Sequence, residues 1–258
     1  ILGGGNIGIS IAQGLAKAGV FPISSILITR RNEAALTPLQ EQGFRVSTSN
    51  ITAARECKVL LICVQPGQMN GLLEEIAPEL TDKHIIISVV SGAKINDITR
   101  FTGGKGMIVR AMPNTAAAIG ESMTCLSSDS PEGLQAAEQI FNSVGICLTI
   151  DEELMVPATA LCACGIAFFL RAVRAASQGG IEIGFHSEDA LLMAAQTAKG
   201  AAALILKNGN HPENEVDKVT TPRGCTISGL NQMEHHGFSS ALIKGITTSS
   251  EKASKLYS

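Results

Sequence analysis

Residues Ile1–Gly19, ILGGGNIGISIAQGLAKAG, decide how this chain folds. Gly3, Gly5 and Gly8 stand in the spacing G-x-G-x-x-G, directly after two apolar residues and before a helical pattern of apolar residues. The first glycine of such a turn allows a tight bend, the second lets the backbone approach a pyrophosphate, and the third lets the helix pack closely against the strand. The stretch therefore predicts a strand, turn and helix that hold a dinucleotide at the helix N-terminus.

The motif alone leaves another interpretation open, because glycine-rich turns between a strand and a helix also occur without a ligand. The helix side of the motif is complete, whereas the strand side is short because the sequence begins at Ile1. We therefore expect this sequence to lack residues that precede Ile1.

The composition is typical of a globular protein with a sizeable core. Of the 258 residues, 45% are hydrophobic and 17% are charged. The net charge of −3 provides no basic surface, which argues against binding to nucleic acid or to an anionic membrane. The longest apolar run, residues 158–170, is too short to span a bilayer, so we predict a buried helix there and no membrane partner.

The seven cysteines are odd in number and lie mostly in apolar contexts. This usage predicts reduced thiols of a cytoplasmic protein rather than a disulfide framework. Cys162 and Cys164 could form a metal or redox pair, but no second pair or histidine lies at ligand spacing, which favours core packing. We expect no metal site.

Short apolar runs alternate with helical patterns up to about residue 150. The runs that predict strands lie at residues 26–28, 44–47, 59–64, 85–90, 107–110, 123–128 and 146–150. Alternation at this spacing predicts an α/β fold with a doubly wound parallel sheet.

From Asp151 onward the strand-like runs stop and helical periodicity continues to the end. We expect helices over about 152–178, over 187–209, after Gly224 and over 238–256. The second of these is apolar on more than one face and needs another surface to cover it, which we interpret as a subunit interface. The predicted domains are therefore 1–150, which binds the dinucleotide, and 151–258, which is all helical.

Arg30 and Arg31 follow the second strand-like run, where a dinucleotide fold faces the adenosine ribose. An acidic residue there would accept hydrogen bonds from both ribose hydroxyls, whereas arginine pairs with a 2′-phosphate. Two arginines and no acid predict NADPH in preference to NADH. A solvated arginine pair at a strand end is the alternative.

Several stretches together resemble the pyrroline-5-carboxylate reductases, and they cover essentially the whole chain in order. They are GGGNIG (3–8), VQP (64–66), SVVSG (88–92), RAMPNT (110–115), HPENEVDKVTTPRGCTISGL (211–230) and HHGF (235–238). The resemblance implies an N-terminal Rossmann domain and a helical C-terminal domain for dimerisation and substrate binding. It also implies NADPH-dependent reduction of 1-pyrroline-5-carboxylate to L-proline, the last step of proline biosynthesis. The expected assembly is a homodimer or a decamer built of dimers, with the substrate between the cofactor and the partner's helices.

The resemblance also assigns a cofactor site. Its residues are Gly3, Gly5, Asn6, Ile7, Gly8, Arg30, Arg31, Asn50, Val64, Gln65, Pro66, Met112, Pro113 and Asn114. The glycine turn would hold the pyrophosphate, the arginine pair the 2′-phosphate, and Asn50 would lie near the adenosine. Residues 64–66 and 112–114 would flank the nicotinamide end.

The substrate loop implied by the resemblance contains Thr221, Gly224, Cys225 and Thr226. Backbone amides at the start of the following helix would hold the carboxylate, and the Thr226 hydroxyl would face the ring nitrogen as the catalytic group. A cyclic iminium is already electrophilic, so holding it face to face with a hydride donor supplies much of the rate. As a local pattern, the loop also fits a Pro-Gly turn with a threonine cap.

Four departures from the family pattern leave fine substrate specificity open. Gln65 replaces a usual lysine, Ala116 replaces a proline, and residues 162–167 read CACGIA instead of SGSGPA. Arg223 breaks a glycine pair beside the substrate loop, where it either adds a charge for the carboxylate or points to water.

These departures keep two other functions under consideration. One is a reductase of another small cyclic imine or of a β-hydroxyacid, although residues 152–178 lack the lysine that a hydroxyacid enzyme would carry on this helix. The other is a non-catalytic cofactor-binding homologue.

Overall fold

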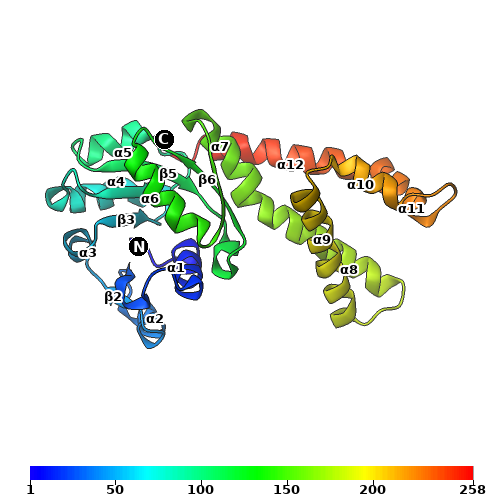
Figure 1. Ribbon diagram of the computed structural model, residues 1–258, viewed down its shortest axis with the longest axis horizontal. Helices are drawn as coiled ribbons and strands as arrows, with labels where there is room; N and C mark the ends of the chain where they lie inside the picture. Colours follow the sequence, from blue (N-terminus) through cyan, green and yellow to red (C-terminus); the bar gives the residue numbers. More distant parts are fainter. Residues whose placement is uncertain (258) are drawn as a thin grey trace. The chain divides into compact units, whose positions relative to one another are not determined.

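The computed structural model describes residues 1–257, and their first part forms a sheet flanked by helices (Figure 1). The strands are β1 (Leu27–Thr29), β2 (Arg45–Ser47), β3 (Val59–Ile62), β4 (Ile85–Ser88), β5 (Met107–Met112), β6 (Ser122–Ser127) and β7 (Gly145–Thr149). β1 pairs with β2, and β3 to β7 follow one another in order. The predicted α/β class with a parallel-dominated sheet is confirmed.

The start of the chain supplies the missing central strand position. Leu2 bridges in parallel to Thr29 of β1 and to Ile62 of β3. Its amide donates to the carbonyl of Leu61 at 2.7 Å, and its carbonyl accepts from the amide of Cys63 at 2.8 Å. The apolar pair before the glycines is therefore strand-like, as the sequence predicts, and it joins the two parts of the sheet.

The last two strands, β6 and β7, depart from the predicted parallel order. β6 runs antiparallel to β5, with Met112 opposite Cys125, while β6 and β7 are parallel. The connection between β5 and β6 holds only a short 3₁₀ helix, Thr115–Ile119. A parallel crossover needs a dozen or more residues, so this short connection permits only an antiparallel return.

Seven α-helices belong to this part of the described chain, and several of them have capping residues at their ends. They are α1 (Asn6–Ala18), α2 (Thr37–Glu41), α3 (Asn50–Glu56), α4 (Pro66–Ile76), α5 (Ile95–Phe101), α6 (Pro131–Asn142) and α7 (Met155–Ala158). Further 3₁₀ turns lie at Ile23–Ser25, Glu33–Ala35, Ala77–Glu79 and Glu152–Leu154. Ser49 and Ser130 cap α3 and α6 by accepting from backbone amides, and Gly19 ends α1 at φ 68°.

The apolar side chains of the sheet divide between two clusters, one on each face. Ile87 of β4 packs with Ile11 of α1 and Phe141 of α6. Its neighbour Ile86 packs with Leu73 of α4 and Ile98 of α5. Successive strand residues point to opposite faces, so helices cover both sides and the sheet is doubly wound.

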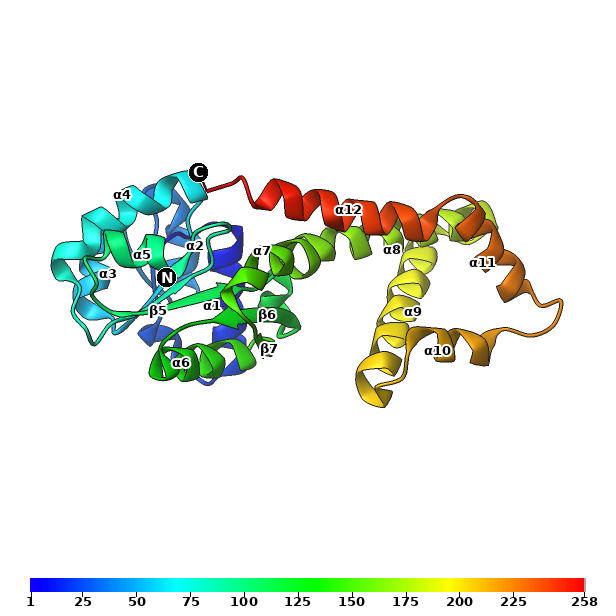
Figure 2. The same cartoon turned by 90° about the horizontal axis from the view of Figure 1, so that it is seen from above.

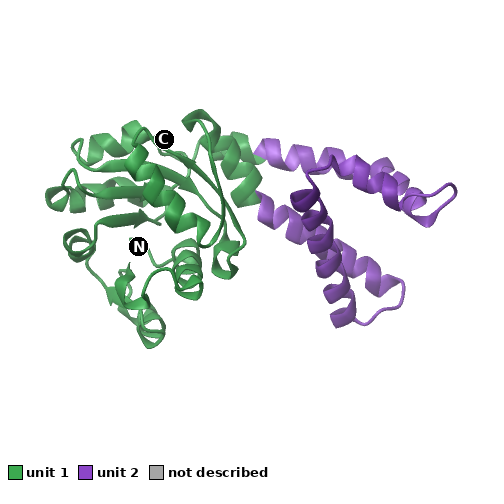
Figure 3. Ribbon diagram, viewed as in Figure 1, with its two compact units in different colours: residues 1–164, 249–258 green, residues 165–248 purple. Residues whose placement is uncertain are grey.

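The chain forms two compact units, shown in different colours in Figure 3. Unit 1 contains residues 1–164 and 249–258, and unit 2 contains residues 165–248. Unit 1 continues beyond β7 because Met155 and Ala158 pack against Met112 and Cys125. The predicted domain boundary at residue 150 stays a prediction.

The last residues of the described chain belong to unit 1. The hydroxyl of Tyr257 donates to Oδ1 of Asn70 on α4 at 2.6 Å, and Figure 2 shows the end of the described chain beside this helix. Tyr257 also packs against the apolar cluster that contains Leu73.

The predicted helix over 152–178 is interrupted. After α7 the chain forms a π-helical segment, Thr159–Cys164, before α8 (Gly165–Glu182). The Thr159 hydroxyl donates to the carbonyl of Met155 at 3.0 Å, and such bonding by a threonine competes with the regular helical ladder. Single π-helical turns within α-helices are frequent at functional sites.

Unit 2 is all helical, as predicted for the C-terminal part. It contains α8, α9 (Ser187–Asn208), α10 (Pro212–Val219), α11 (Cys225–His235) and most of α12 (Phe238–Ala253). The sequence did not predict α10, because PENEVDKV is too polar to show apolar periodicity. Pro212 in its first turn and His211, which accepts from the amide of Glu213, start this helix.

Large apolar side chains of unit 2 are exposed in the single chain. Phe169 is 61% exposed, Leu192 69% and Leu206 75%. The prediction that residues 158–170 form a buried helix is wrong for the single chain, where Leu161 and Leu170 are also more than half exposed. Exposed apolar side chains in this number are typical of a surface that binds another protein surface, which the single chain does not supply.

By length and composition alone, two helical stretches would be able to cross a membrane. They are Glu152–Glu182, with a mean hydropathy of 1.9, and Ser187–Asn208, with 1.2. Only 28% and 6% of these windows are buried. Helices that associate with other helices in water have the same composition, so the composition alone does not assign them to a membrane.

Candidate functional site

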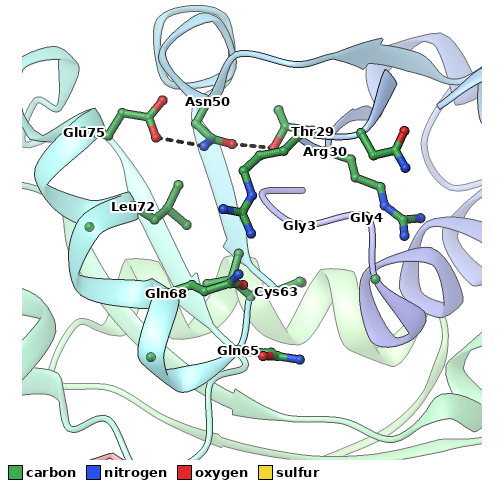
Figure 4. A pocket seen from close by; sticks show the side chains of 16 residues that line it. Gly3, Gly4, Thr29, Arg30, Asn50, Cys63, Gln65, Gln68, Leu72 and Glu75 are labelled. Atoms are coloured by element: carbon green, nitrogen blue, oxygen red, sulfur yellow. Dashed lines mark hydrogen bonds between the residues drawn. The ribbon is translucent and has the colours of Figure 1, made fainter. Parts of the chain in front are cut away.

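A pocket of about 680 Å³ in unit 1 opens where the glycine turn meets the carboxyl ends of β1 and β3 (Figure 4). Its lining residues are Gly3, Gly4, Gly5, Thr29, Arg30, Arg31, Asn32, Asn50, Cys63, Val64, Gln65, Gly67, Gln68, Gly71, Leu72 and Glu75. Ligands of open α/β sheets bind at this edge, outside the carboxyl ends of the strands.

The three glycines of the turn have different surroundings. Gly3 has φ 112°, and a Cβ there would lie 2.6 Å from the carbonyl oxygen of Cys63. A Cβ at Gly8 would lie 2.2 Å from the carbonyl oxygen of Gly3. A Cβ at Gly5 would meet no protein atom within 4 Å, so this glycine faces open space in the pocket. Gly3 and Gly8 thus permit the backbone packing, and Gly5 leaves room for a ligand.

The turn presents the start of α1 to the pocket. Gly5 is the N-cap of α1 and offers no side-chain cap, and the first intrahelical bond runs from the amide of Ile9 to the carbonyl of Gly5. The amides of Asn6, Ile7 and Gly8 therefore remain available. Free amides at a helix start suit a phosphate group.

Arg30 and Arg31 follow β1 and line the pocket with exposed side chains. The amide of Arg30 donates to the carbonyl of Ser47, which fixes the backbone at this point. Within residues 1–257 neither guanidinium takes part in an ion pair. Two uncompensated cations at the pocket rim fit an anionic ligand group.

A row of hydrogen bonds crosses the same rim. The Thr29 hydroxyl donates to Oδ1 of Asn50 at 2.6 Å, and Nδ2 of Asn50 donates to Oε2 of Glu75 at 3.0 Å (Figure 4). The two partners fix the orientation of the Asn50 amide. Asn50 therefore lies ready to contact a ligand from a defined position.

Sequence reasoning missed the pocket residues of α4. Gln68, Leu72 and Glu75 recur at three- and four-residue steps after Gln65, so they lie on one helix face. Extending the helical pattern from Pro66 would have identified this face.

The pocket brings together only part of the predicted cofactor site. Gly3, Gly5, Arg30, Arg31, Asn50, Val64 and Gln65 line it. Asn6, Ile7, Gly8 and Pro66 lie in the adjoining first turns of α1 and α4, outside the lining. The assignment of these residues to a cofactor stays a prediction.

Residues 112–114 also lie outside the pocket lining, at the end of β5. Asn114 is used in the fold: its Oδ1 accepts from the amide of Ala116 at 3.0 Å, and its Nδ2 donates to the carbonyl of Cys162 at 3.2 Å. The side chain thus joins the end of β5 to the π-helical segment.

A buried cation supports the same strand. Arg110 is 2% exposed, and its Nη1 lies 3.4 Å from Oε1 of Glu152, which also accepts from the amide of Ile95 at 2.6 Å. Burial lowers the pKa of Arg110, an effect that the carboxylate opposes. The pair connects β5 with α5 and the chain that follows β7.

The predicted substrate loop lies in unit 2, directly before α11. The Gly224 amide donates to the carbonyl of Thr221 at 2.8 Å, and a Cβ at Gly224 would lie 2.5 Å from Oγ1 of Thr221. Gly224 is the N-cap of α11 and provides no side-chain cap. The amides that follow, from Cys225 and Thr226, are available for an anion.

Arg223 takes an unusual backbone conformation in this loop. Its φ of 61° is the only positive value at a non-glycine residue within the described chain. The family pattern implies glycine at this position, which would adopt the conformation without strain. The Arg223 side chain is exposed in the single chain.

A second cavity, of about 1290 Å³, lies within unit 2 between α8, α9, α11 and the start of α12. Its lining is mostly apolar and includes Phe169, Met193, Ala198 and Phe238. Within residues 1–257, no group of three or more His, Cys, Asp or Glu side chains is arranged to hold a metal ion.

Two family models match the chain. Residues 152–256 match the model described as pyrroline-5-carboxylate reductase dimerisation. Residues 1–92 match the model described as NADP oxidoreductase coenzyme F420-dependent. Together they match parts of both compact units and leave residues 93–151 unmatched.

Curated relatives agree along the whole chain. Pyrroline-5-carboxylate reductase 1 of Dictyostelium discoideum is 55% identical over 100% of this chain and 49% of the relative. Pyrroline-5-carboxylate reductase 2 of the same organism is 50% identical over 99% of this chain and 91% of the relative. The chain thus spans about half the length of the first relative and nearly all of the second.

Solved structures show the same fold. Plasmodium falciparum pyrroline carboxylate reductase with NADP bound superposes with a TM-score of 0.91 at 26% identity, covering 100% of this chain and 97% of that one. A pyrroline-5-carboxylate reductase from Coxiella burnetii gives 0.88 at 27% identity with the same coverage. The identity to these relatives over the whole chain and the shared fold show that this chain belongs to the pyrroline-5-carboxylate reductase family.

Proposed function

We propose that this protein catalyses the last step of proline biosynthesis, the NADPH-dependent reduction of 1-pyrroline-5-carboxylate to L-proline. The observation that carries the proposal is the match to reductases of this name over the whole chain. The pocket beside the glycine turn supplies the physical support, because it has the features that a dinucleotide phosphate needs.

The residues of unit 1 fit NADPH. The free amides of Asn6, Ile7 and Gly8 would bind the pyrophosphate, and Gly5 leaves space for it. Arg30 and Arg31 would bind the 2′-phosphate, which NADH lacks. Asn50, fixed by Thr29 and Glu75, would contact the adenosine side.

The nicotinamide end would lie toward residues 64–66 and 112–114. When bound, the nicotinamide supplies the hydride for the C=N bond. The chain's own contribution at this end is position: Asn114 and the Arg110–Glu152 pair hold the end of β5 in place. Correct placement of two reactants accounts for much of the rate in such a reaction.

The substrate loop would bind the ring from its carboxylate side. The amides of Cys225 and Thr226 at the start of α11 would hold the carboxylate, with Thr221 and Gly224 shaping the turn. The Thr226 hydroxyl would hydrogen-bond the ring nitrogen and orient the C=N bond toward the hydride donor.

We also propose a homodimer, or a decamer built of dimers, through the helical part of the chain. The match to a dimerisation family and the exposed apolar side chains of α8 and α9 support association with a second copy. The same apolar faces would then be covered by protein and not by a membrane. All seven cysteines are free thiols, which suits a cytoplasmic protein.

The decisive experiment follows the absorbance of NADPH with 1-pyrroline-5-carboxylate as substrate, with NADH in a parallel assay. We expect rapid oxidation that yields proline, with a higher kcat/KM for NADPH. Binding of NADPH without oxidation would contradict the reaction and favour a non-catalytic homologue. Turnover only with another small cyclic imine or a β-hydroxyacid would retain the reductase and reject the substrate.

A further inference from the structure

Two cysteine thiols meet inside unit 1, away from the cofactor pocket. Cys125 lies on β6 and is 4% exposed, and Cys162 lies in the π-helical segment and is half-buried. Their Sγ atoms are 3.8 Å apart. A disulfide has an S–S distance of about 2.05 Å, so the two Sγ atoms need to approach each other by about 1.8 Å to form one.

The two thiols are not equivalent. The hydrogen bond between the Cys125 and Cys162 thiols lowers the pKa of Cys162 to about 7. The same hydrogen bond, together with burial, raises the pKa of Cys125. Cys162 is thus the thiol with more thiolate and more solvent access, and Cys125 is the protonated partner behind it. This is the arrangement of an attacking and a resolving cysteine.

Both cysteines contact the end of β5. Cys125 is the antiparallel register partner of Met112, and Met112 lies in the same apolar cluster as Cys125 and Cys162. The carbonyl of Cys162 accepts from Nδ2 of Asn114 at 3.2 Å. Because Cys125 contacts Met112 and Cys162 contacts Asn114 directly, a movement of either cysteine would displace one of these residues.

The sequence supports a redox role for Cys125 and Cys162. Cys162 and Cys164 stand where the family pattern has serines, and serine cannot form a disulfide. The π-helical segment that carries Cys162 and Cys164 replaces the regular bonds of an α-helix with longer i→i+5 bonds, an arrangement that is frequent at functional sites.

We propose that Cys125 and Cys162 form a reversible disulfide when the protein meets a peroxide, and that this bond displaces Met112 and Asn114 and slows the reductase. The effect on rate rests on the proposed function, because it takes residues 112–114 as neighbours of the nicotinamide. The disulfide itself does not. Transient redox-sensing disulfides are the kind that occurs in reducing compartments.

The reaction balances with hydrogen peroxide as the oxidant. The Cys162 thiolate attacks one peroxide oxygen, the O–O bond breaks, and Cys162 becomes a sulfenic acid as hydroxide leaves and takes up a proton to form water. The Cys125 sulfur then attacks the Cys162 sulfur, the S–O bond breaks, and a second water leaves with the Cys125 proton. Two thiols are oxidised by two electrons and one peroxide is reduced to two waters. An external dithiol reverses the bond by exchange.

The experiment treats the full-length chain, in a Cys225→Ser background, with one equivalent of hydrogen peroxide. This background removes the exposed thiol of the substrate loop, and its own reduced activity is the reference. We expect a mass loss of about 2 Da and a cross-linked peptide that joins Cys125 to Cys162. Activity should fall about tenfold and return with dithiothreitol, because small displacements at a reacting centre have effects of this order.

Two further variants serve as test and matched control. Cys162→Ser should abolish both the mass loss and the oxidative loss of activity, each relative to its own reduced form. Cys164→Ser, two residues away in the same segment, should retain both. A cross-link between Cys162 and Cys164, or an unchanged response of Cys162→Ser, would overturn the proposal.

The readouts separate this proposal from the proposed function. Absence of the Cys125–Cys162 peptide after peroxide would reject the pair even in a fully active reductase. Formation of the peptide without any change in activity would reject the coupling to residues 112–114. Should the protein not reduce 1-pyrroline-5-carboxylate at all, the peptide would still decide whether the disulfide forms, and the NADPH dissociation constant would decide the coupling.

Discussion

The two compact units use their apolar residues in opposite ways. In unit 1, Ile86 and Ile87 of one strand are both fully buried, each under a different layer of helices. In unit 2, Leu170 and Leu192 on α8 and α9 are 63% and 69% exposed. Unit 1 completes its core within one chain, whereas unit 2 presents an apolar surface that a single chain leaves uncovered.

This difference separates two kinds of stability. The folding of unit 1 depends on side chains of the same chain, so it should not depend on protein concentration. In the proposed homodimer the helices of unit 2 would bury apolar side chains against a second copy, so their stability should rise with concentration. The comparison also predicts that cofactor binding and assembly can be disrupted separately.

The largest effect is expected from charges on the exposed face of unit 2. Leu170→Glu combined with Leu192→Glu should raise the dimer dissociation constant about 10³-fold or more, since each buried leucine contributes about 1.5–3 kcal/mol and occurs twice in a two-fold interface. Sedimentation analysis measures the change. Val20→Glu, at an apolar residue of unit 1 that is 59% exposed, is the control and should leave the mass unchanged. A double variant with the wild-type mass would refute the interface.

Two phenylalanines compare the units directly. Phe141 of unit 1 is fully buried, so Phe141→Ala should lower the free energy of unfolding by about 3–5 kcal/mol at any protein concentration. Phe169 of unit 2 is 61% exposed, so the effect of Phe169→Ala should depend on concentration. Urea unfolding at two concentrations tests both, and a concentration-independent effect at both residues would contradict the comparison.

The cofactor end of unit 1 is tested by the arginine pair. Arg30→Ala with Arg31→Ala should raise the KM for NADPH about 10- to 100-fold, because hydrogen bonds to a charged group contribute about 1.5–3 kcal/mol. The KM for NADH should change little. Lys17→Ala removes an exposed cation of α1 outside the pocket and should affect neither cofactor. Equal effects on NADPH and NADH would remove the 2′-phosphate assignment.

Thr226 tests the substrate loop of unit 2 in the same way. Thr226→Ala should lower kcat about tenfold or more, as expected for loss of a positioned hydrogen bond, while NADPH binding in unit 1 is retained. Thr226→Ser keeps the hydroxyl and should restore most of the turnover. The proposed role fails if Thr226→Ala turns over at the wild-type rate.

The smallest effect is expected at Arg223, where the backbone conformation favours glycine. Arg223→Gly should raise the free energy of unfolding by about 1 kcal/mol, because the left-handed conformation of a residue with a Cβ costs about 1–2 kcal/mol. Thermal unfolding measures this gain, and a loss of stability would contradict it. The KM for the substrate in this variant then decides whether the side chain binds the carboxylate or points to water.

Local sequence signals predicted unit 1 well. The glycine turn and the apolar runs place its first helix and its strands within a few residues of the observed bounds. Asn50 entered the predicted site only through the family resemblance. Local spacing, by contrast, indicated Gly3, Gly5 and Arg30 at one edge of the sheet, and these residues line one pocket. This works because parallel strands bring the residues that follow them to the same edge of the sheet.

The errors have different physical causes, and those at residues 158–170 and at Glu75 depend on contacts between chains or between distant parts of the chain. The antiparallel direction of β6 follows from a short connection between two strands. α10 shows no apolar periodicity, and the exposed face of residues 158–170 needs a second surface. Glu75 enters the pocket through a hydrogen bond to Asn50, a residue of another helix.

The sequence by itself determined the α/β class, the dinucleotide turn and the family, since these depend on local spacing and on motifs of fixed order. Only the tertiary structure decided that Leu2 fills the gap between β1 and β3, that Glu75 orients Asn50, and that Cys125 lies beside Cys162. Side chains from distant segments come into contact only when strand register and helix packing are fixed, and no local sequence pattern determines which of them will meet.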